Sequence, residues 1–70
     1  MKSKYVSKFT TPEGRAFRRV ITYYPSLNLS RAEYWKLEGA SGTLVLDQFL
    51  NGFPTADVIS SMEDEVTEGM

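Results

Sequence analysis

The chain contains neither cysteine nor histidine. A disulfide is therefore excluded, and the two commonest zinc-ligand types are missing, so we expect no metal and no other cofactor. The sequence also has no glycine-rich phosphate loop and no nucleophile elbow. Because histidine and cysteine are frequent acid–base and nucleophilic groups, we expect a protein that is not an enzyme.

Long apolar runs are also missing. No segment approaches the roughly 20 apolar residues that a membrane-spanning helix needs. The first nine residues include three lysines but no continuous apolar stretch, so they do not form a signal peptide. These two absences predict a cytoplasmic protein.

The chain is short, with 70 residues, which is enough for one small domain. A domain of this size buries only about 60% of its unfolded surface and has a thin stability margin. Nine aromatic side chains provide material for a core. Self-association would bury further apolar surface, so we expect a homodimer.

The basic residues are confined to one half of the chain. Residues 1–38 hold all eight lysines and arginines against three acidic residues, a net charge of +5, whereas residues 39–70 hold six acidic residues and no basic one. One interpretation is internal neutralisation, with the acidic end folded against the basic half. The other is a displayed acidic surface that competes with DNA for a basic cleft.

The first 24 residues have the pattern of a β-hairpin. Residues 3–10 alternate with a period of two, and residues 15–24 are rich in aromatic and β-branched types. Between them, Pro12 favours the first corner of a turn and Gly14 favours a left-handed position. The turn pairs Thr11 with Arg15.

This register separates the hairpin into two faces. Its pairs are Lys4–Thr22, Tyr5–Ile21, Val6–Val20, Ser7–Arg19, Lys8–Arg18 and Phe9–Phe17. The face with Phe9 and Phe17 is predicted to pack on the core. The other face is basic and has Tyr24 at its end, so it is either solvated or binds an anion such as a nucleic acid.

Residues 30–38 have local signals for a short helix. Ser30 and Glu33 match a capping box, and Leu29 and Tyr34 match a hydrophobic staple. Gly39 then fits the left-handed position that ends a helix. A helix of about eight residues is too short to persist without packing, so we expect it to lie on the sheet.

This predicted helix would be apolar on two sides. Tyr34 and Leu37 fall on one side, and Ala32 and Trp35 fall on nearly the opposite side. One side would face the sheet. The other would be covered either by the C-terminal segment or by a second protein.

The second half of the chain completes the predicted fold. Residues 43–50 fit either a short helix or a strand, and their length and the flanking glycines favour a strand. Thr55 can cap a last helix that has Val58, Ile59, Met62 and Val66 at helical spacing. Because the acidic residues that follow oppose the helix dipole, we expect this helix to fray beyond Met62 and the chain to end in disorder.

Together these signals predict an α+β fold. Residues 1–54 form a three-stranded antiparallel sheet with one packed helix, in the order ββαβ, and Phe9, Phe17, Ile21 and Leu37 lie in its core. Residues 55–70 form an acidic C-terminal helix or tail.

Around the predicted helix the chain resembles the small uracil-DNA glycosylase inhibitors of short-tailed phages of Gram-positive hosts. These proteins also place a hairpin with a turn glycine before an L-x-L-S entry, a short acidic and aromatic helix, a glycine and a final strand. The residues that carry the resemblance are Gly14, Leu27, Leu29, Ser30, Glu33, Leu37 and Gly39. The second strand and the helix are longer here, Tyr34 and Trp35 replace a phenylalanine, and the segment after Gly52 has no counterpart.

The resemblance implies a phage-encoded homodimer in the host cytoplasm. Its helices would frame an apolar groove that traps the residue with which the glycosylase opens DNA, while acidic groups occupy the enzyme's DNA cleft. We therefore expect a protein-binding inhibitor of a host DNA-acting enzyme that acts by DNA mimicry. The expected partner-binding residues are Tyr24, Glu33, Tyr34, Trp35, Leu37 and Glu38. The alternative is a small nucleic-acid-binding module that uses the basic hairpin face, although the isoelectric point near 5.3 argues against it.

Overall fold

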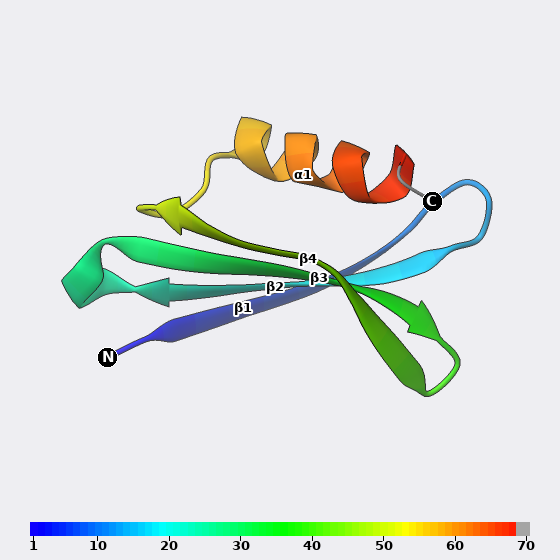
Figure 1. Ribbon diagram of the computed structural model, residues 1–70, viewed down its shortest axis with the longest axis horizontal. Helices are drawn as coiled ribbons and strands as arrows, with labels where there is room; N and C mark the ends of the chain where they lie inside the picture. The colour runs from blue at the N-terminus through cyan, green and yellow to red at the C-terminus, as the bar shows by residue number, and fades with distance from the viewer. Residues whose placement is uncertain (69–70) are drawn as a thin grey trace.

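The computed structural model describes residues 1–68. It contains a sheet of four antiparallel strands in the order β1-β2-β3-β4, followed by one C-terminal helix. Figure 1 shows the helix lying along one side of the sheet. The elements are β1 (Ser3–Thr10), β2 (Ala16–Tyr24), the 3-10 turn η1 (Pro25–Leu27), β3 (Leu29–Glu38), β4 (Ser41–Asn51) and α1 (Ala56–Glu68).

The predicted β1–β2 hairpin is confirmed in strands, turn and register. Phe9 lies opposite Phe17 and Lys8 opposite Arg18, as expected. The Thr11 amide donates to the Arg15 carbonyl at 2.9 Å, and the Gly14 amide donates to the Thr11 carbonyl at 2.9 Å. Gly14 has a φ of 88°, a left-handed value that glycine adopts without steric cost.

The predicted helix over 30–38 is wrong, because this segment is strand β3. The Ser30 hydroxyl donates to the Gly52 carbonyl at 2.5 Å instead of capping a helix. Gly39 does have a left-handed φ, of 61°, but it forms a two-residue turn with Ala40 between β3 and β4. The sheet therefore has four strands where three were predicted, and the fold is α+β with its helix at the C-terminus.

The two-sided apolar pattern of residues 30–38 follows from this strand. Side chains alternate between the faces of a sheet, so Ala32 and Tyr34 point to one face while Trp35 and Leu37 point to the other. The predicted grouping of Tyr34 with Leu37 is wrong for the same reason. β2 and β4 satisfy the backbone of β3 on both sides, which outweighs the local preference for a helix.

Residues 43–50 form a strand, as the glycine punctuation indicated. β4 extends from Ser41 to Asn51 and pairs with β3. The register shifts by one residue at Val45, because Tyr34 lies opposite Leu46 and Trp35 lies opposite Leu44. This bulge bends the strand and leaves Val45 without a direct partner.

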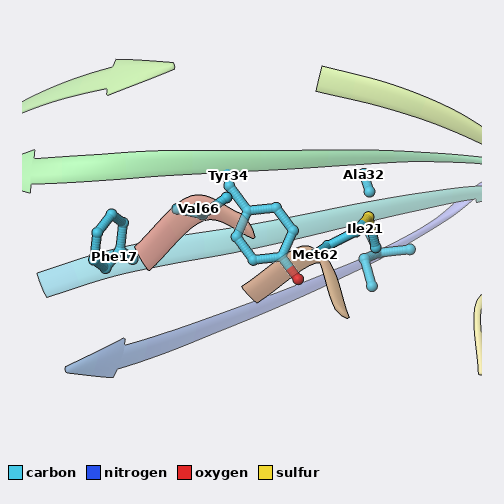
Figure 2. Packing of buried hydrophobic residues seen from close by; sticks show 6 residues of the cluster. All are labelled: Phe17, Ile21, Ala32, Tyr34, Met62 and Val66. Carbon is cyan, nitrogen blue, oxygen red and sulfur yellow. The ribbon is translucent and has the colours of Figure 1, made fainter. Parts of the chain in front are cut away.

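The core lies between the sheet and α1. Phe17, Ile21, Ala32 and Tyr34 from the sheet form one buried cluster with two helix residues, Met62 and Val66. Figure 2 shows the Tyr34 ring in the middle of this cluster. The predicted core positions Phe17 and Ile21 are confirmed, and Phe9 stacks on Phe17 with 5.3 Å between ring centroids. Leu37 does not join them, because it lies on the opposite face of the sheet.

α1 begins where the sequence indicated, with the Thr55 hydroxyl accepting a hydrogen bond from the Val58 amide at 3.3 Å. It continues to Glu68, so the prediction of fraying beyond Met62 is wrong for 63–68. The reason is Val66, whose burial in the core holds the last turns against the sheet. Residues 69–70, on which the rest of that prediction falls, lie outside the described residues. The domain boundary between 54 and 55 stays a prediction.

Candidate interaction surface

The face of the sheet opposite α1 is the candidate functional surface, and we call it the open face. Within residues 1–68 no helix packs on it (Figure 1). The strand registers place matching residues of all four strands in rows across this face. From the hairpin end to the opposite end, the rows are Thr10–Ala16–Leu37–Gly42, Lys8–Arg18–Trp35–Leu44, Val6–Val20–Glu33–Asp47, Lys4–Thr22–Arg31–Phe49 and Tyr24–Leu29–Asn51.

Apolar side chains are exposed on both edges of the open face. Val6 on β1 is 57% exposed, while Leu44 and Phe49 on β4 are 40% and 59% exposed. The Trp35 side chain lies between these edges and is half-buried. Leu44 is the direct neighbour of Trp35, and the exposed apolar groups on this face make it a candidate surface for binding another molecule.

In the β3–β4 half of the open face, Arg31 contacts three neighbouring side chains. Its Nε and Nη2 atoms donate to the two carboxylate oxygens of Asp47 at 2.9 and 2.7 Å, a bidentate pair between neighbouring strands. The Glu33 carboxylate lies 3.7 Å away from the same guanidinium, which also sits 5.8 Å from the Phe49 ring centroid. The hydrogen bond from Arg31 lowers the pKa of Asp47 below its ordinary value.

The β1–β2 half of the open face has cations that, unlike Arg31, are not paired with a carboxylate of the described residues. Lys8 and Arg18 lie directly opposite each other, and within residues 1–68 neither forms a salt bridge. They line a pocket of about 230 Å³ together with Trp35 and Leu37, and the turn between β3 and β4 closes one end of it. Two adjacent cations without a carboxylate repel each other, so this half attracts an anionic group.

The predicted partner-binding residues fall into three places. Tyr24, Glu33, Trp35 and Leu37 all lie on the open face, where Glu33, Trp35 and Leu37 are in consecutive rows and Tyr24 is at the opposite end from Leu37. Tyr34 is fully buried on the α1 face, where its hydroxyl donates to the Ile59 carbonyl at 3.4 Å. It therefore cannot touch a partner, and burial raises the pKa of Tyr34 above its ordinary value. Glu38 is exposed at the end of β3.

Sequence reasoning missed the contribution of β4 to this surface. Leu44, Asp47 and Phe49 lie on the open face because β4 pairs with β3, a pairing that was not predicted. Residues 44–49 do not alternate between apolar and polar types, and the bulge at Val45 interrupts the period of two, so no simple pattern in the sequence marked this face. A correct strand assignment for residues 30–38 with the turn at Gly39 and Ala40 would have paired Arg31 with Gln48, because only the bulge at Val45 brings Phe49 opposite Arg31.

The outer side of α1 is the acidic surface of the molecule. Asp57, Asp64, Glu65 and Glu68 are exposed there. A groove of about 410 Å³ between the hairpin turn and the end of α1 is lined by four carboxylates, those of Glu13, Glu63, Asp64 and Glu68. In the described part of the chain, no three acidic residues converge on a geometry that could hold a metal ion.

Comparisons with known proteins find no match. No protein-family model matches the chain, no curated protein matches it, and no solved structure matches its fold. Among residues 1–68 there is also no helix long and apolar enough to cross a membrane. The resemblance to the glycosylase inhibitors stays a prediction.

Proposed function

We propose that this protein is a small non-catalytic binding module that recognises another protein through the open face. The observation that carries the proposal is the exposure of Val6, Leu44 and Phe49 on the same face as Trp35, the face of the sheet that α1 leaves uncovered. Contact with a protein partner would remove these apolar groups from water, which is the main source of affinity at such surfaces.

We further propose that the module inhibits a host DNA-acting enzyme, with uracil-DNA glycosylase as the leading candidate. The resemblance at the L-x-L-S segment supports this target, but β3 cannot supply the predicted helix groove. The acidic surface of α1 is a better DNA mimic. Four exposed carboxylates, those of Asp57, Asp64, Glu65 and Glu68, lie along this helix, whereas the Glu63 carboxylate is paired with Arg19. Asp64, Glu65 and Glu68 lie within about 6 Å along the helix axis, so this end of α1 is a dense negative surface that a basic DNA cleft would attract.

The test is uracil excision from DNA with the protein present at equimolar and tenfold amounts. We expect inhibition that weakens as salt rises, because the proposed contact is electrostatic. Neutralising Asp64 and Glu68 together, as Asp64→Asn and Glu68→Gln, should weaken inhibition, whereas Glu38→Gln, which lies at the end of β3 and outside the acidic groove, should leave most of it. Full glycosylase activity at tenfold excess would remove this enzyme as the target.

The more general proposal, that the protein binds another protein through the open face, has a separate test. Binding of a protein partner other than the glycosylase, which is proposed to contact α1, should be lost in the Phe49→Asp variant, which places a charge on the open face. The control is Leu27→Asp, since Leu27 is 68% exposed but lies in η1, outside the open face. Equal loss in both variants, or loss in neither, would reject the open face as the binding surface.

Nucleic-acid binding is the second candidate function. It is favoured by one observation, the pocket in which Lys8 and Arg18 adjoin the Trp35 ring. A base stacked on this ring would place its phosphate near the two cations. The test is fluorescence anisotropy with single-stranded DNA at about 150 mM salt, where retained tight binding that is lost in Trp35→Ala would favour this function over the protein-binding one.

A further inference from the structure

The open face is divided into two halves of opposite charge. The β1–β2 half carries three cations, Lys4, Lys8 and Arg18, and no acidic residue. The β3–β4 half carries Glu33 and Asp47 against the single cation Arg31. A net charge of +3 therefore adjoins a net charge of −1 on one continuous surface, whose exposed apolar groups lie on both edges.

We propose that the open face binds a second copy of this chain, face to face, with β1 of each copy lying over β4 of the other. This inference rests on the proposed function of the open face as a protein-binding surface and names its partner. A two-fold axis parallel to the strands and midway between β2 and β3 produces the arrangement. It makes the surface complementary to itself, as a symmetric dimer requires.

The row pattern specifies the contacts of this dimer. Lys4 and Lys8 of one copy lie over the rows on either side of Asp47 in the other copy, so both cations reach that carboxylate. Arg18 lies over the Trp35 ring of the second copy, beside its Glu33. Because the axis is two-fold, every contact occurs twice.

A face-to-face dimer whose two-fold axis is perpendicular to the strands is unfavourable. An axis perpendicular to the strands would place β1 over β1, so Lys4 and Lys8 would face the same lysines of the second copy. Like charges brought together in an interface repel each other, and the parallel axis avoids this repulsion. The charge pattern therefore favours the axis parallel to the strands over the perpendicular one.

The size of the open face limits the strength of the dimer. Four strands span about 14 Å between their outer axes, and five rows span about 30 Å, so each copy buries roughly 500 Å². The total of about 1,000 Å² is at the lower end for specific interfaces, so we expect a dimer that dissociates at micromolar concentrations. Both α1 helices stay on the outside, which leaves their acidic surfaces available.

The first experiment combines sedimentation with charge reversal. The wild-type chain should sediment as a dimer at about 100 μM and as the 7.9 kDa monomer at high dilution. Two variants remove the complementarity, namely Lys8→Glu with Arg18→Glu, which makes the face acidic, and Asp47→Lys, which makes it basic. Each alone should weaken the dimer at least about tenfold, and an equimolar mixture of the two should restore it.

The second experiment tests the orientation by crosslinking, which is simple because the natural chain has no cysteine. Val6→Cys on β1 and Leu44→Cys on β4 each introduce one exposed thiol. A mixture of the two variants treated with a short bis-maleimide should give mainly the mixed crosslinked dimer. Crosslinking of Val6→Cys to itself at an equal or higher yield would overturn the proposed axis.

The outcomes separate this inference from the proposed function. A wild-type chain that remains monomeric at about 100 μM, with charge variants that sediment like it, overturns the dimer. If such a monomer still binds a different protein and loses that binding in Phe49→Asp, the proposed function survives. The monomer could instead bind single-stranded DNA and lose that binding in the double variant that combines Lys8→Glu and Arg18→Glu. In that case both proposals fail and the open face is a nucleic-acid-binding surface.

Discussion

The Arg19 guanidinium on β2 and the Glu63 carboxylate on α1 form a salt bridge that joins the sheet to the helix. Arg19 belongs to the basic first half of the chain and Glu63 to the acidic second half. Arg31 and Asp47 join the two halves in the same way. Some of the opposite charges of the two halves therefore neutralise each other within the fold. The exposed acidic residues of α1 and the cations of the open face remain displayed on the surface.

The Arg19–Glu63 pair predicts a measurable loss of stability in Glu63→Gln. Both side chains are less than one-third exposed, so water screens their attraction only in part. We expect the free energy of unfolding to fall by about 1 kcal/mol, measured by urea denaturation.

Its matched control is Asp64→Asn, one residue along the helix and exposed. Removing a negative charge near the C-terminal end of a helix is neutral or slightly favourable. Equal destabilisation by both changes would mean that overall helix charge, and not the bond to Arg19, is responsible.

The burial of Met62 against the sheet leads to the prediction that α1 is required for the fold. Its side chain is 4% exposed within the cluster formed with the sheet. Met62→Ala should lower the free energy of unfolding by about 2–5 kcal/mol, a large fraction for a small domain. Ser61→Ala, at the exposed neighbouring position, should change it by less than about 0.5 kcal/mol. If both variants unfold at the same urea concentration, α1 is not part of the cooperative core.

The Arg31–Asp47 pair predicts a specific loss of stability in acid. The pKa of Asp47 is lower in the folded chain than its ordinary value of 3.8, so the ionised form favours folding. The contribution is present above the unfolded pKa and is lost as pH falls through the lower, folded pKa. Arg31→Gln should therefore reduce the stability difference between pH 6 and pH 3, measured as the shift in urea midpoint. An unchanged shift would mean that other carboxylates determine the acid response.

The hairpin was predictable because its signals are local and agree with one another. Pro12 and Gly14 fix the turn, and the turn fixes the pairing of Phe9 with Phe17. α1 was predictable for a similar reason, since Met62 and Val66 follow the helical period. Its length was underestimated because burial of Val66 depends on the sheet, which lies far away in sequence.

The assignment of residues 30–38 failed because local and tertiary preferences conflict there. Ser30, Glu33 and Gly39 favour a helix within the segment, while the backbone partners that make it a strand come from β2 and β4. A helix period places Tyr34 with Leu37, whereas a strand period places it with Ala32. This single difference moved Tyr34 from the predicted binding surface into the core and left Trp35 on the open face.

This conflict can be measured on a peptide covering residues 28–39. Without its neighbouring strands the segment has only its own preferences, so we expect circular dichroism to show little structure in water and a helical spectrum in trifluoroethanol. A peptide of this length is marginal as a helix in water, which is why the alcohol is needed. Ser30→Ala should reduce the helical signal by removing the capping box, whereas Ser26→Ala in a peptide extended to residue 25 should not. A strand-like spectrum in the alcohol would show that β3 is encoded locally and that the capping residues are incidental.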